Sequence, residues 1–462
     1  MVVCFKNLNP IEALIVSIWF LVGVRGAVQN DTWWHLAAGR RILQDRTFLT
    51  VDPFSWVLSG GAYWPHHEWL SDVVMYLLFS IGGISLLHVA VGIVFALVPV
   101  IAIQLARSSA KHRNTGGTSA LVLLLVLPWI ATGASIRPHI VTMLLLLITV
   151  WILSARRFQF LAPIFFMWAQ LHGGVCLGGL IVGGAIVASF VTRDRDRYRS
   201  LWWGVISGVA VAVNPLSLDI YIHPFRSTAI TRTLPIQEWL PPLTLGWQGY
   251  YLAALLALFM LVIWVARRRL SEWEVVVQLS SFLVVLPVML LHARVVSLAL
   301  PIAAAFVVTI LGNRDEATRV HALRASPIYS LVLLVVSMAI YSVVQLRETS
   351  PENPISQQGI EVINSSPQRL FNTYDTGGFL IWFTPLQKVF IDSRQDPYPA
   401  KLLQEAIYVQ TSGDYEQFFG NFDIRTAVVE RHFQLHRKLV EDGWRVKYSG
   451  PFFDVLITPS AH

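Results

Sequence analysis

The sequence predicts an α-helical bundle that crosses a membrane many times and continues into a small α/β domain. Hydrophobic residues make up 55% of the 462 residues and charged residues only 14%, well below the share of about a quarter that is typical of soluble domains. Apolar stretches of roughly 20 residues, the length that a spanning helix needs, recur as far as residue 346. Beyond that point charged residues become frequent. Together these observations place the chain among polytopic membrane proteins.

Each apolar stretch is interpreted as one span, which leads to about eleven transmembrane helices. They are expected near residues 11–27, 85–106, 118–135, 139–155, 159–172, 174–192, 200–214, 249–266, 273–291, 295–312 and 327–346. No clear cleavage site with small residues follows the first stretch. We therefore interpret 11–27 as a retained helix, with a signal peptide as the alternative.

Arginine-rich clusters in the short loops predict the orientation in the membrane. The clusters are Arg107–Lys111–Arg113, Arg156–Arg157, Arg193–Arg195–Arg197–Arg199, Arg267–Arg268–Arg269 and Arg314–Arg319–Arg324. An excess of Lys and Arg marks cytoplasmic loops, so the amino terminus is expected in the cytoplasm and the carboxyl-terminal tail outside it. The net charge of +7 is then a sign of orientation, and nucleic acid is not expected as a partner.

The chain is expected to form two domains, a transmembrane domain over 1–346 and a soluble extracytoplasmic domain over 347–462. Within the first domain, residues 28–84 form a long outer loop rich in Trp. Two amphipathic stretches in this loop, Thr32–Gln44 and Glu68–Ile81, are expected to be helices that lie in the membrane interface. A full span at this second stretch is the alternative, but the stretch is too short for one.

The tail is expected to be a small α/β domain because strand-like and helical patterns alternate along it. The strand-like runs are 388–392, 425–430 and 452–458, and the helical patterns are 400–410, 414–420 and 434–442. Asp375–Gly378 and Asp392–Asp396 follow predicted strands. Such positions can bind sugars, and ordinary turns explain them equally well.

Asp31 is the first candidate for catalysis because it directly follows the first span, in the run Asn30–His35. A carboxylate near the membrane surface that is flanked by indole rings loses hydration and can act as a general base. The alternative is a structural role as the N-cap of a helix over Trp33–Leu43.

A second group of candidates lies later in the same outer loop. It comprises Asp52, His66, His67 and Glu68, together with His35. Two histidines and a glutamate could coordinate a divalent metal with Asp31 or His35. Adjacent histidines point in different directions in regular structure, however. Hydrogen bonding to substrate is therefore preferred and no metal ligand is assigned, although a divalent metal stays open. A turn at Asp52 and a helix cap at Glu68 are the structural alternatives.

Isolated polar residues recur at the outer ends of later spans. They are Arg137, His139, His172, Asn214, Glu238, His292 and Arg294. The two arginines suit a lipid-linked phosphate or pyrophosphate, which a planar guanidinium binds through two hydrogen bonds. Glu238 is a second candidate carboxylate in a long outer loop rich in proline. For each residue alone, the alternative is a side chain that reaches toward lipid headgroups.

These motifs resemble a family of uncharacterised bacterial multi-span proteins that are similar to the GT-C glycosyltransferases. The resemblance rests on Asp31–Arg40, Asp52–Ser55, His67–Leu70, Arg137–His139, Leu171–Gly174, Asn214–Pro215, Glu238–Trp239, Gly377–Gly378 and Asp392–Arg394. It implies sugar transfer from a polyprenyl-phosphate donor in the bacterial inner membrane, usually with inversion. It also implies that Asp31 is the general base. Many members carry two adjacent acids, whereas Asn30 and Thr32 flank a single Asp31 here, so Glu68 or Asp52 is expected to supply the second carboxylate.

The resulting hypothesis is an integral-membrane glycosyltransferase whose catalytic residues are Asp31 and Glu68. Its partners would be a polyprenyl-phosphate sugar, the lipid bilayer and an envelope glycan, lipid or protein as acceptor. No cofactor is assigned. The alternatives are a transporter or flippase for an envelope lipid, which should place polar residues near the middle of its spans, and a scaffold of an envelope assembly complex that binds through its tail.

Overall fold

The computed structural model describes residues 8–58, 61–109, 116–231, 236–269, 272–311, 355–366 and 369–459. The expected span 327–346, the expected domain boundary at 346 and the last basic cluster lie outside these residues. The chain divides into two compact units. The helical unit comprises Met1–Ala27, Ser85–Tyr221 and Ile236–Glu348, and the mixed unit comprises Val28–Ile84, Ile222–Pro235 and Thr349–His462. The first outer loop thus packs with the carboxyl-terminal tail in one unit.

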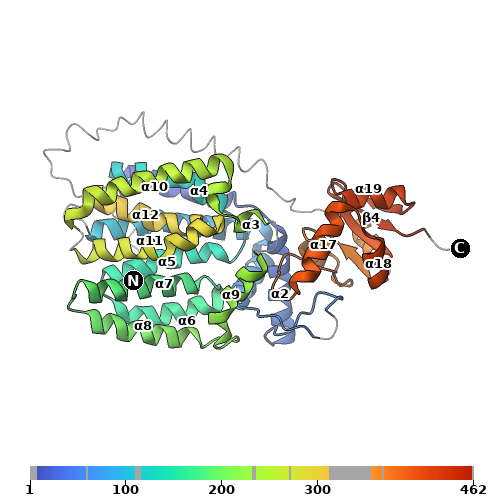
Figure 1. Cartoon of the computed structure of the whole chain (residues 1–462), viewed down its shortest axis with the longest axis horizontal. Coiled ribbons are helices and arrows are strands. Elements are labelled where there is room, and N and C mark those ends of the chain that lie inside the picture. Colours follow the sequence, from blue (N-terminus) through green and yellow to red (C-terminus); the bar gives the residue numbers. More distant parts are fainter. Residues whose placement is uncertain are drawn as a thin grey trace. The chain divides into compact units, whose positions relative to one another are not determined.

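The helical unit is a bundle of apolar helices (Figure 1). Its helices are α1 (Pro10–Val24), the second part of α3 (Trp69–Ser109), α4 (Gly116–Thr132), α5 (His139–Ser154), α6 (Leu161–Leu171), α7 (Val175–Val191), α8 (Arg197–Val211), α10 (Gly246–Ala266), α11 (Trp273–Leu291) and α12 (Ala293–Leu311). Within the described ranges, α3, α10, α11 and α12 are long and apolar enough to cross a membrane, and several others are apolar but shorter. Helices therefore form at the expected spans that the structure describes.

Helix α12 is the centre of this bundle. It packs against α4, α5 and α11, and 89% of its most apolar stretch is buried, whereas only 22% of the corresponding stretch of α10 is buried. A helix that is apolar all round is suited either to a protein core or to lipid. The difference in burial assigns α12 to the core of the bundle and α10 to its periphery.

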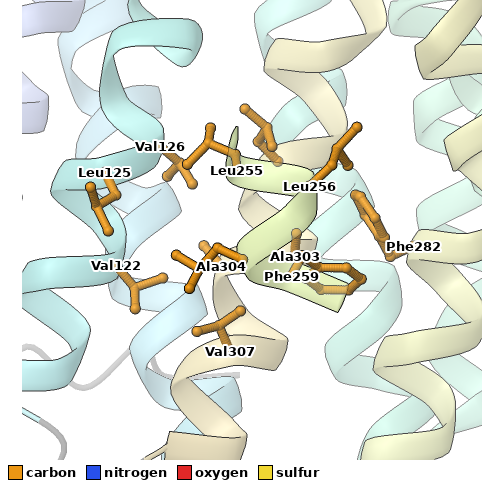
Figure 2. A pocket seen from close by; sticks show the side chains of 12 residues that line it. Val122, Leu125, Val126, Leu255, Leu256, Phe259, Phe282, Ala303, Ala304 and Val307 are labelled. Carbon is orange, nitrogen blue, oxygen red and sulfur yellow. The ribbon is translucent and has the colours of Figure 1, made fainter. Parts of the chain in front are cut away.

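A small apolar cavity of about 40 Å³ lies between α4, α10, α11 and α12. Figure 2 shows side chains such as Val122, Leu255, Phe259 and Val307 converging on it. The residues that line the cavity are all hydrocarbon in character. The cavity therefore offers space for an apolar group but no side chain that could carry out acid–base chemistry.

Both helices expected in the first outer loop are present. Helix α2 covers Asn30–Asp45, and the second amphipathic stretch forms the first part of α3. The helical backbone is interrupted at Gly82 and Gly83, where Gly83 has φ 62° and ψ −158°, a conformation that glycine adopts without steric cost. The interruption separates the amphipathic helix from the apolar helix that follows it.

Helix α2 begins two residues earlier than the N-cap interpretation of Asp31 requires. Its N-cap is Gln29, whose backbone N–H donates to the Thr32 hydroxyl at 3.1 Å. Asp31 lies in the first turn of the helix. The interpretation of Asp31 as the N-cap is therefore wrong, and its carboxylate is available for other contacts.

The tail forms the expected α/β structure. A four-stranded sheet has the order β1-β2-β4-β3, with β1 (Leu370–Asn372) parallel to β2 (Thr426–Glu430), and with β4 (Phe453–Ile457) antiparallel to both β2 and β3 (Arg445–Ser449). The helices are α15 (Gln357–Asn364), α16 (Gly377–Phe383), α17 (Ala400–Ser412), α18 (Glu416–Phe422) and α19 (Gln434–Glu441). The three helical patterns and the strands at 425–430 and 452–458 are confirmed.

The expected strand at 388–392 is wrong. This segment makes only one bridge, between Val389 and Ser55, and the side chain of Asn372 bonds to the backbone of Phe390 and Ile391 at 2.7 Å in each case. The side chain of Asn372 thus makes the backbone hydrogen bonds that a neighbouring strand would otherwise make. A pattern of β-prone residues cannot distinguish these two ways of satisfying an extended backbone.

Helix α16 packs closely against α2 because Gly378 has no side chain. A Cβ atom at this position would lie 2.2 Å from the carbonyl oxygen of Asn30. We therefore expect Gly378→Ala to separate the two helices and to lower the free energy of unfolding of the mixed unit by about 1–3 kcal/mol. Limited proteolysis across a temperature series measures this effect.

Gly420→Ala is the matched control for that substitution. Gly420 lies inside α18, and no atom would lie within 4 Å of an added Cβ. Alanine should raise stability there by about 0.5–1 kcal/mol because it reduces the freedom of the unfolded chain. Equal protease resistance of the Gly378→Ala variant and the parent protein would show that α16 and α2 are not in close contact.

Candidate functional site

Asp31 is held in the first turn of α2 by hydrogen bonds to one carboxylate oxygen. The indole N–H of Trp34 donates to Oδ1 at 3.2 Å, and the hydroxyl of Ser393 donates to the same atom. These two hydrogen bonds restrict the orientation of the Asp31 carboxylate. Ser393 lies 362 residues further along the chain, so the tail takes part in orienting Asp31.

A second carboxylate, Asp375, lies close to Asp31. Desolvation by the surrounding chain, and then the negative charge of Asp31, raises the pKa of Asp375, although its side chain still reaches solvent. Glu430 lies beyond it and accepts a hydrogen bond from the Thr373 hydroxyl at 2.7 Å. Burial raises the pKa of Glu430 to about 7. Both acids come from the tail.

The segment Asp392–Asp396 connects the tail to the first outer loop; we call it the DSRQD loop. Ser393 bonds to Asp31, and Arg394 bonds to Asp52 at 2.7 Å. Gln395 has φ 59°, a left-handed conformation that turns the chain sharply. These contacts make the DSRQD loop a structural part of the site, beyond the ordinary turn that its sequence also allowed.

Arg394 is the buried centre of this loop. Its guanidinium pairs with Asp52 at 2.7 Å and with Asp392 at 2.6 Å, and the three side chains are at most 1% exposed. Burial disfavours the charge, but the two carboxylates outweigh it and raise the pKa of Arg394. Asp52 also accepts the backbone N–H groups of Phe54 and Ser55. Asp52 is thus placed to hold the loop in position.

His35 and His66 both contact Asp72, an acid that was not among the predicted site residues. Oδ1 of Asp72 is hydrogen-bonded to Nδ1 of His35 at 2.6 Å, and Oδ2 is hydrogen-bonded to Nε2 of His66 at 2.7 Å. Burial, with smaller contributions from His67 and Arg394, lowers the pKa of His66 to about 3. Asp72 follows Glu68 by one helical turn, which is the sequence signal that could have identified it.

His67 points away from His66 and joins a different group, as expected for adjacent histidines. Its ring centroid lies 4.4 Å from that of His223 in α9 (Asp219–Thr231). Nε2 of His223 lies 3.6 Å from Oδ2 of Asp396, and Nε2 of His67 lies 3.6 Å from Oε1 of Glu68. We call His67, His223 and Asp396 the HHD cluster. Its ligand atoms lie within 4.8 Å of one another, so these residues could hold a metal ion.

Burial determines the protonation of the HHD cluster. Burial, and then the neighbouring His223, lowers the pKa of His67. Burial raises the pKa of Asp396 to about 6. Burial therefore disfavours the charged form of both side chains.

The helical unit contains a separate group of predicted residues. Arg137 makes two contacts with Glu238, at 3.0 and 3.4 Å, and Arg294 makes one at 3.4 Å. Burial would raise the pKa of Glu238, but the two arginines outweigh it and lower the pKa to about 2. Glu238 therefore stays ionised and acts as a counter-ion. Two arginines thus contact one carboxylate.

Three other predicted residues in this unit are engaged in local structure. His292 donates from Nδ1 to the carbonyl oxygen of Trp239 at 3.2 Å. Nδ1 of His172 accepts the backbone N–H of Gly174 at 2.9 Å, and Asn214 accepts the N–H of Leu216 at 2.7 Å. These contacts support the loops between helices.

His139 lies nearer to the arginine group. Its Nε2 lies 3.0 Å from the carbonyl oxygen of Gly133, and the charges of Arg294 and Arg137 reach it. The predicted site residues therefore lie in both units. Asp31, His35, Asp52, His66, His67 and Glu68 belong to the mixed unit. In the helical unit Arg137, Arg294 and His139 lie near Glu238, whereas His172 and Asn214 each make a local hydrogen bond.

Comparisons with known proteins find solved structures with a similar fold. No protein-family model matches the chain, and no curated protein matches it. A crystal structure of ArnT from Cupriavidus metallidurans bound to undecaprenyl phosphate is similar over 98% of both chains, with a TM-score of 0.57 and 13% identity. The oligosaccharyltransferase of Archaeoglobus fulgidus, tethered to an acceptor peptide, is similar over 91% of this chain and 69% of its own, with a TM-score of 0.57 and 11% identity.

Both solved structures belong to GT-C glycosyltransferases. The similarity covers nearly the whole of this chain, including the mixed unit and the apolar helices. It confirms the expected likeness to GT-C glycosyltransferases at the level of the fold. The chain has the fold of a GT-C glycosyltransferase.

Proposed function

We propose that this protein is an integral-membrane glycosyltransferase that moves a sugar from a polyprenyl-phosphate donor to an envelope acceptor on the extracytoplasmic side. The observation that carries the proposal is the oriented carboxylate of Asp31, directly after the first apolar helix of a GT-C-like fold. The similar ArnT structure is bound to undecaprenyl phosphate, and the similar oligosaccharyltransferase is tethered to an acceptor peptide. These two ligands support a lipid-linked donor and a separate acceptor.

In the proposed reaction Asp31 acts as general base. It takes the proton of an acceptor hydroxyl while the acceptor oxygen forms a bond to the anomeric carbon of the sugar. The bond between that carbon and the phosphate oxygen breaks, and its electron pair leaves with the polyprenyl phosphate. Attack from the face opposite to the leaving group inverts the anomeric configuration.

The group formed by Arg137, Arg294 and Glu238 is suited to binding the phosphate of the donor. Arg137 and Arg294 both contact the carboxylate of Glu238. Cations that are already in place stabilise the charge that develops on a leaving phosphate. In this proposal Arg137 and Arg294 bind the donor phosphate, and Glu238 holds the two side chains in position.

Asp375 is the second carboxylate in this proposal. Its pKa is raised by desolvation and by the charge of Asp31, as expected for an acid next to a base. Glu68 lies instead between His35, at 3.8 Å, and His67, at 3.6 Å. Its role as a catalytic residue therefore stays a prediction.

The direct test supplies the purified protein in lipid nanodiscs with a panel of polyprenyl-phosphate sugars and with an envelope extract as acceptor. We expect one donor to be consumed and polyprenyl phosphate to be released. The transporter alternative predicts a different result, in which a donor crosses the bilayer of a vesicle and is recovered intact. Recovery of every donor unchanged, with the protein folded, would overturn the proposal.

Arg294→Ala tests the phosphate role. Loss of one charge-assisted hydrogen bond should raise the KM for the donor roughly tenfold or more, with a smaller change in kcat. Arg294→Lys should recover part of the affinity because it keeps the charge but not the planar geometry. Arg269→Ala is the control, since Arg269 pairs with Glu272 at the other end of the neighbouring helix. An unchanged donor KM in Arg294→Ala would contradict this assignment.

A further inference from the structure

We propose that the HHD cluster is a binding site for a divalent transition metal, with zinc as the best match, and that the metal joins three distant segments of the mixed unit. His67 comes from the first outer loop, His223 from α9 and Asp396 from the DSRQD loop. The inference concerns metal binding and does not depend on sugar transfer.

The spacing of the ligand atoms fits one ion. Zinc binds imidazole nitrogen and carboxylate oxygen at about 2.0–2.2 Å with tetrahedral angles, which places neighbouring ligand atoms roughly 3.4 Å apart. Nε2 of His223 and Oδ2 of Asp396 are 3.6 Å apart, and the three ligand atoms lie within 4.8 Å of one another. A separation of 3.6 Å is too long for a hydrogen bond. It suits two atoms that face a common cation.

The surrounding contacts orient these ligands. Nδ1 of His67 bonds to the carbonyl oxygen of Pro65 at 3.2 Å, so Nδ1 carries the proton and Nε2 can act as a ligand. Ser227 donates a hydrogen bond to Asp396. Metal-binding histidines and carboxylates are usually held by second contacts of this kind.

The donor set also selects the class of metal. Two imidazoles and one carboxylate suit zinc and neighbouring transition metals, whereas calcium and magnesium prefer oxygen ligands. Glu68 lies 3.6 Å from Nε2 of His67, but the group whose ligand atoms lie within 4.8 Å of one another comprises only His67, His223 and Asp396. The proposed site therefore has three protein ligands, and a fourth tetrahedral position would be taken by water or substrate.

A metal at this position would stabilise the mixed unit. The three ligands are separated by long stretches of sequence, and one ion that binds all of them closes large loops, which is where such a link has its largest effect. The DSRQD loop also carries Ser393, which bonds to Asp31. A metal at Asp396 would therefore also hold Ser393 in place.

The test measures metal content and stability of the full-length protein in nanodiscs. After removal of metal with a chelator, the parent protein is titrated with Zn²⁺ and, separately, with Co²⁺, whose visible absorption reports tetrahedral nitrogen and oxygen ligands. We expect one ion per chain, a Co²⁺ absorption band and a higher Tm with Zn²⁺. His67→Gln, His223→Gln and Asp396→Asn should each weaken Zn²⁺ binding at least tenfold.

His436→Ala is the matched control. His436 also lies in the mixed unit and also faces an aspartate, but its Nε2 is hydrogen-bonded to Asp454 at 2.8 Å. This variant should bind Zn²⁺ as the parent protein does. The proposal is wrong if Zn²⁺ binding is equally strong in the three ligand variants. It is also wrong if the folded parent protein shows neither a Co²⁺ band nor a Zn²⁺-dependent rise in Tm, a result that remains decisive even where a ligand variant fails to fold.

Discussion

Asp31→Asn should lower the rate of sugar transfer by about 100-fold or more, the contribution that a positioned general base usually makes. Asparagine keeps the shape of the side chain and can still accept the hydrogen bonds from Trp34 and Ser393. It cannot take a proton from the acceptor hydroxyl. The variant should therefore be present in the membrane at the level of the parent protein, and kcat should fall while the KM for the donor changes little.

Asp45→Asn is the control for this experiment. Asp45 is the last residue of the same helix, is exposed and pairs with Arg41 one turn earlier, so its replacement should leave transfer unchanged. Ser393→Ala should give an intermediate loss of rate, since it removes one bond that orients Asp31 but keeps the base. If Asp31→Asn retains full activity, Asp31 is not the base and the proposed mechanism fails.

Arg394→Met is expected to have the largest effect on stability. The substitution keeps much of the side-chain volume but leaves the carboxylates of Asp52 and Asp392 buried without their cation. Removal of one partner from a buried ion pair typically costs about 3–5 kcal/mol. We expect the mixed unit to unfold at a markedly lower temperature, which limited proteolysis of the nanodisc-bound protein follows through cleavage in the tail.

Arg425→Met serves as the comparison. Arg425 pairs with Asp423 at 3.0 Å, but its side chain is 65% exposed, and such pairs contribute about 1 kcal/mol at most. The variant should unfold as the parent protein does. Equal stability of Arg394→Met and the parent protein would show that the buried pairs do not hold the DSRQD loop in place.

Asp31→Asn and Arg394→Met also distinguish a loss of catalysis from a loss of stability. Asp31→Asn should remove activity without loss of stability, whereas Arg394→Met should lower stability first and activity as a consequence, because Ser393 belongs to the same loop. Activity that recovers at low temperature in Arg394→Met, but not in Asp31→Asn, would confirm this division of roles.

Much of the local structure could be predicted from the sequence. Apolar stretches, amphipathic periodicity and alternating strand-like runs each depend on residues that are close in sequence, and the corresponding helices and two of the expected strands are present. The prediction at 388–392 failed because Asn372 satisfies that backbone from a distance. The membrane class and the position of Asp31 after the first helix were likewise accessible from local patterns.

The partners of the candidate residues were decided only by the tertiary structure. Asp31 bonds to a serine 362 residues away, and Asp52 pairs with an arginine 342 residues away. His223 and Asp396 complete a cluster with His67 that no spacing in the sequence indicates. The sequence by itself determined which segments are apolar, helical or extended, since those properties arise from neighbouring residues. Which acids, cations and imidazoles meet depends on the packing of distant segments, and only the folded chain decides it.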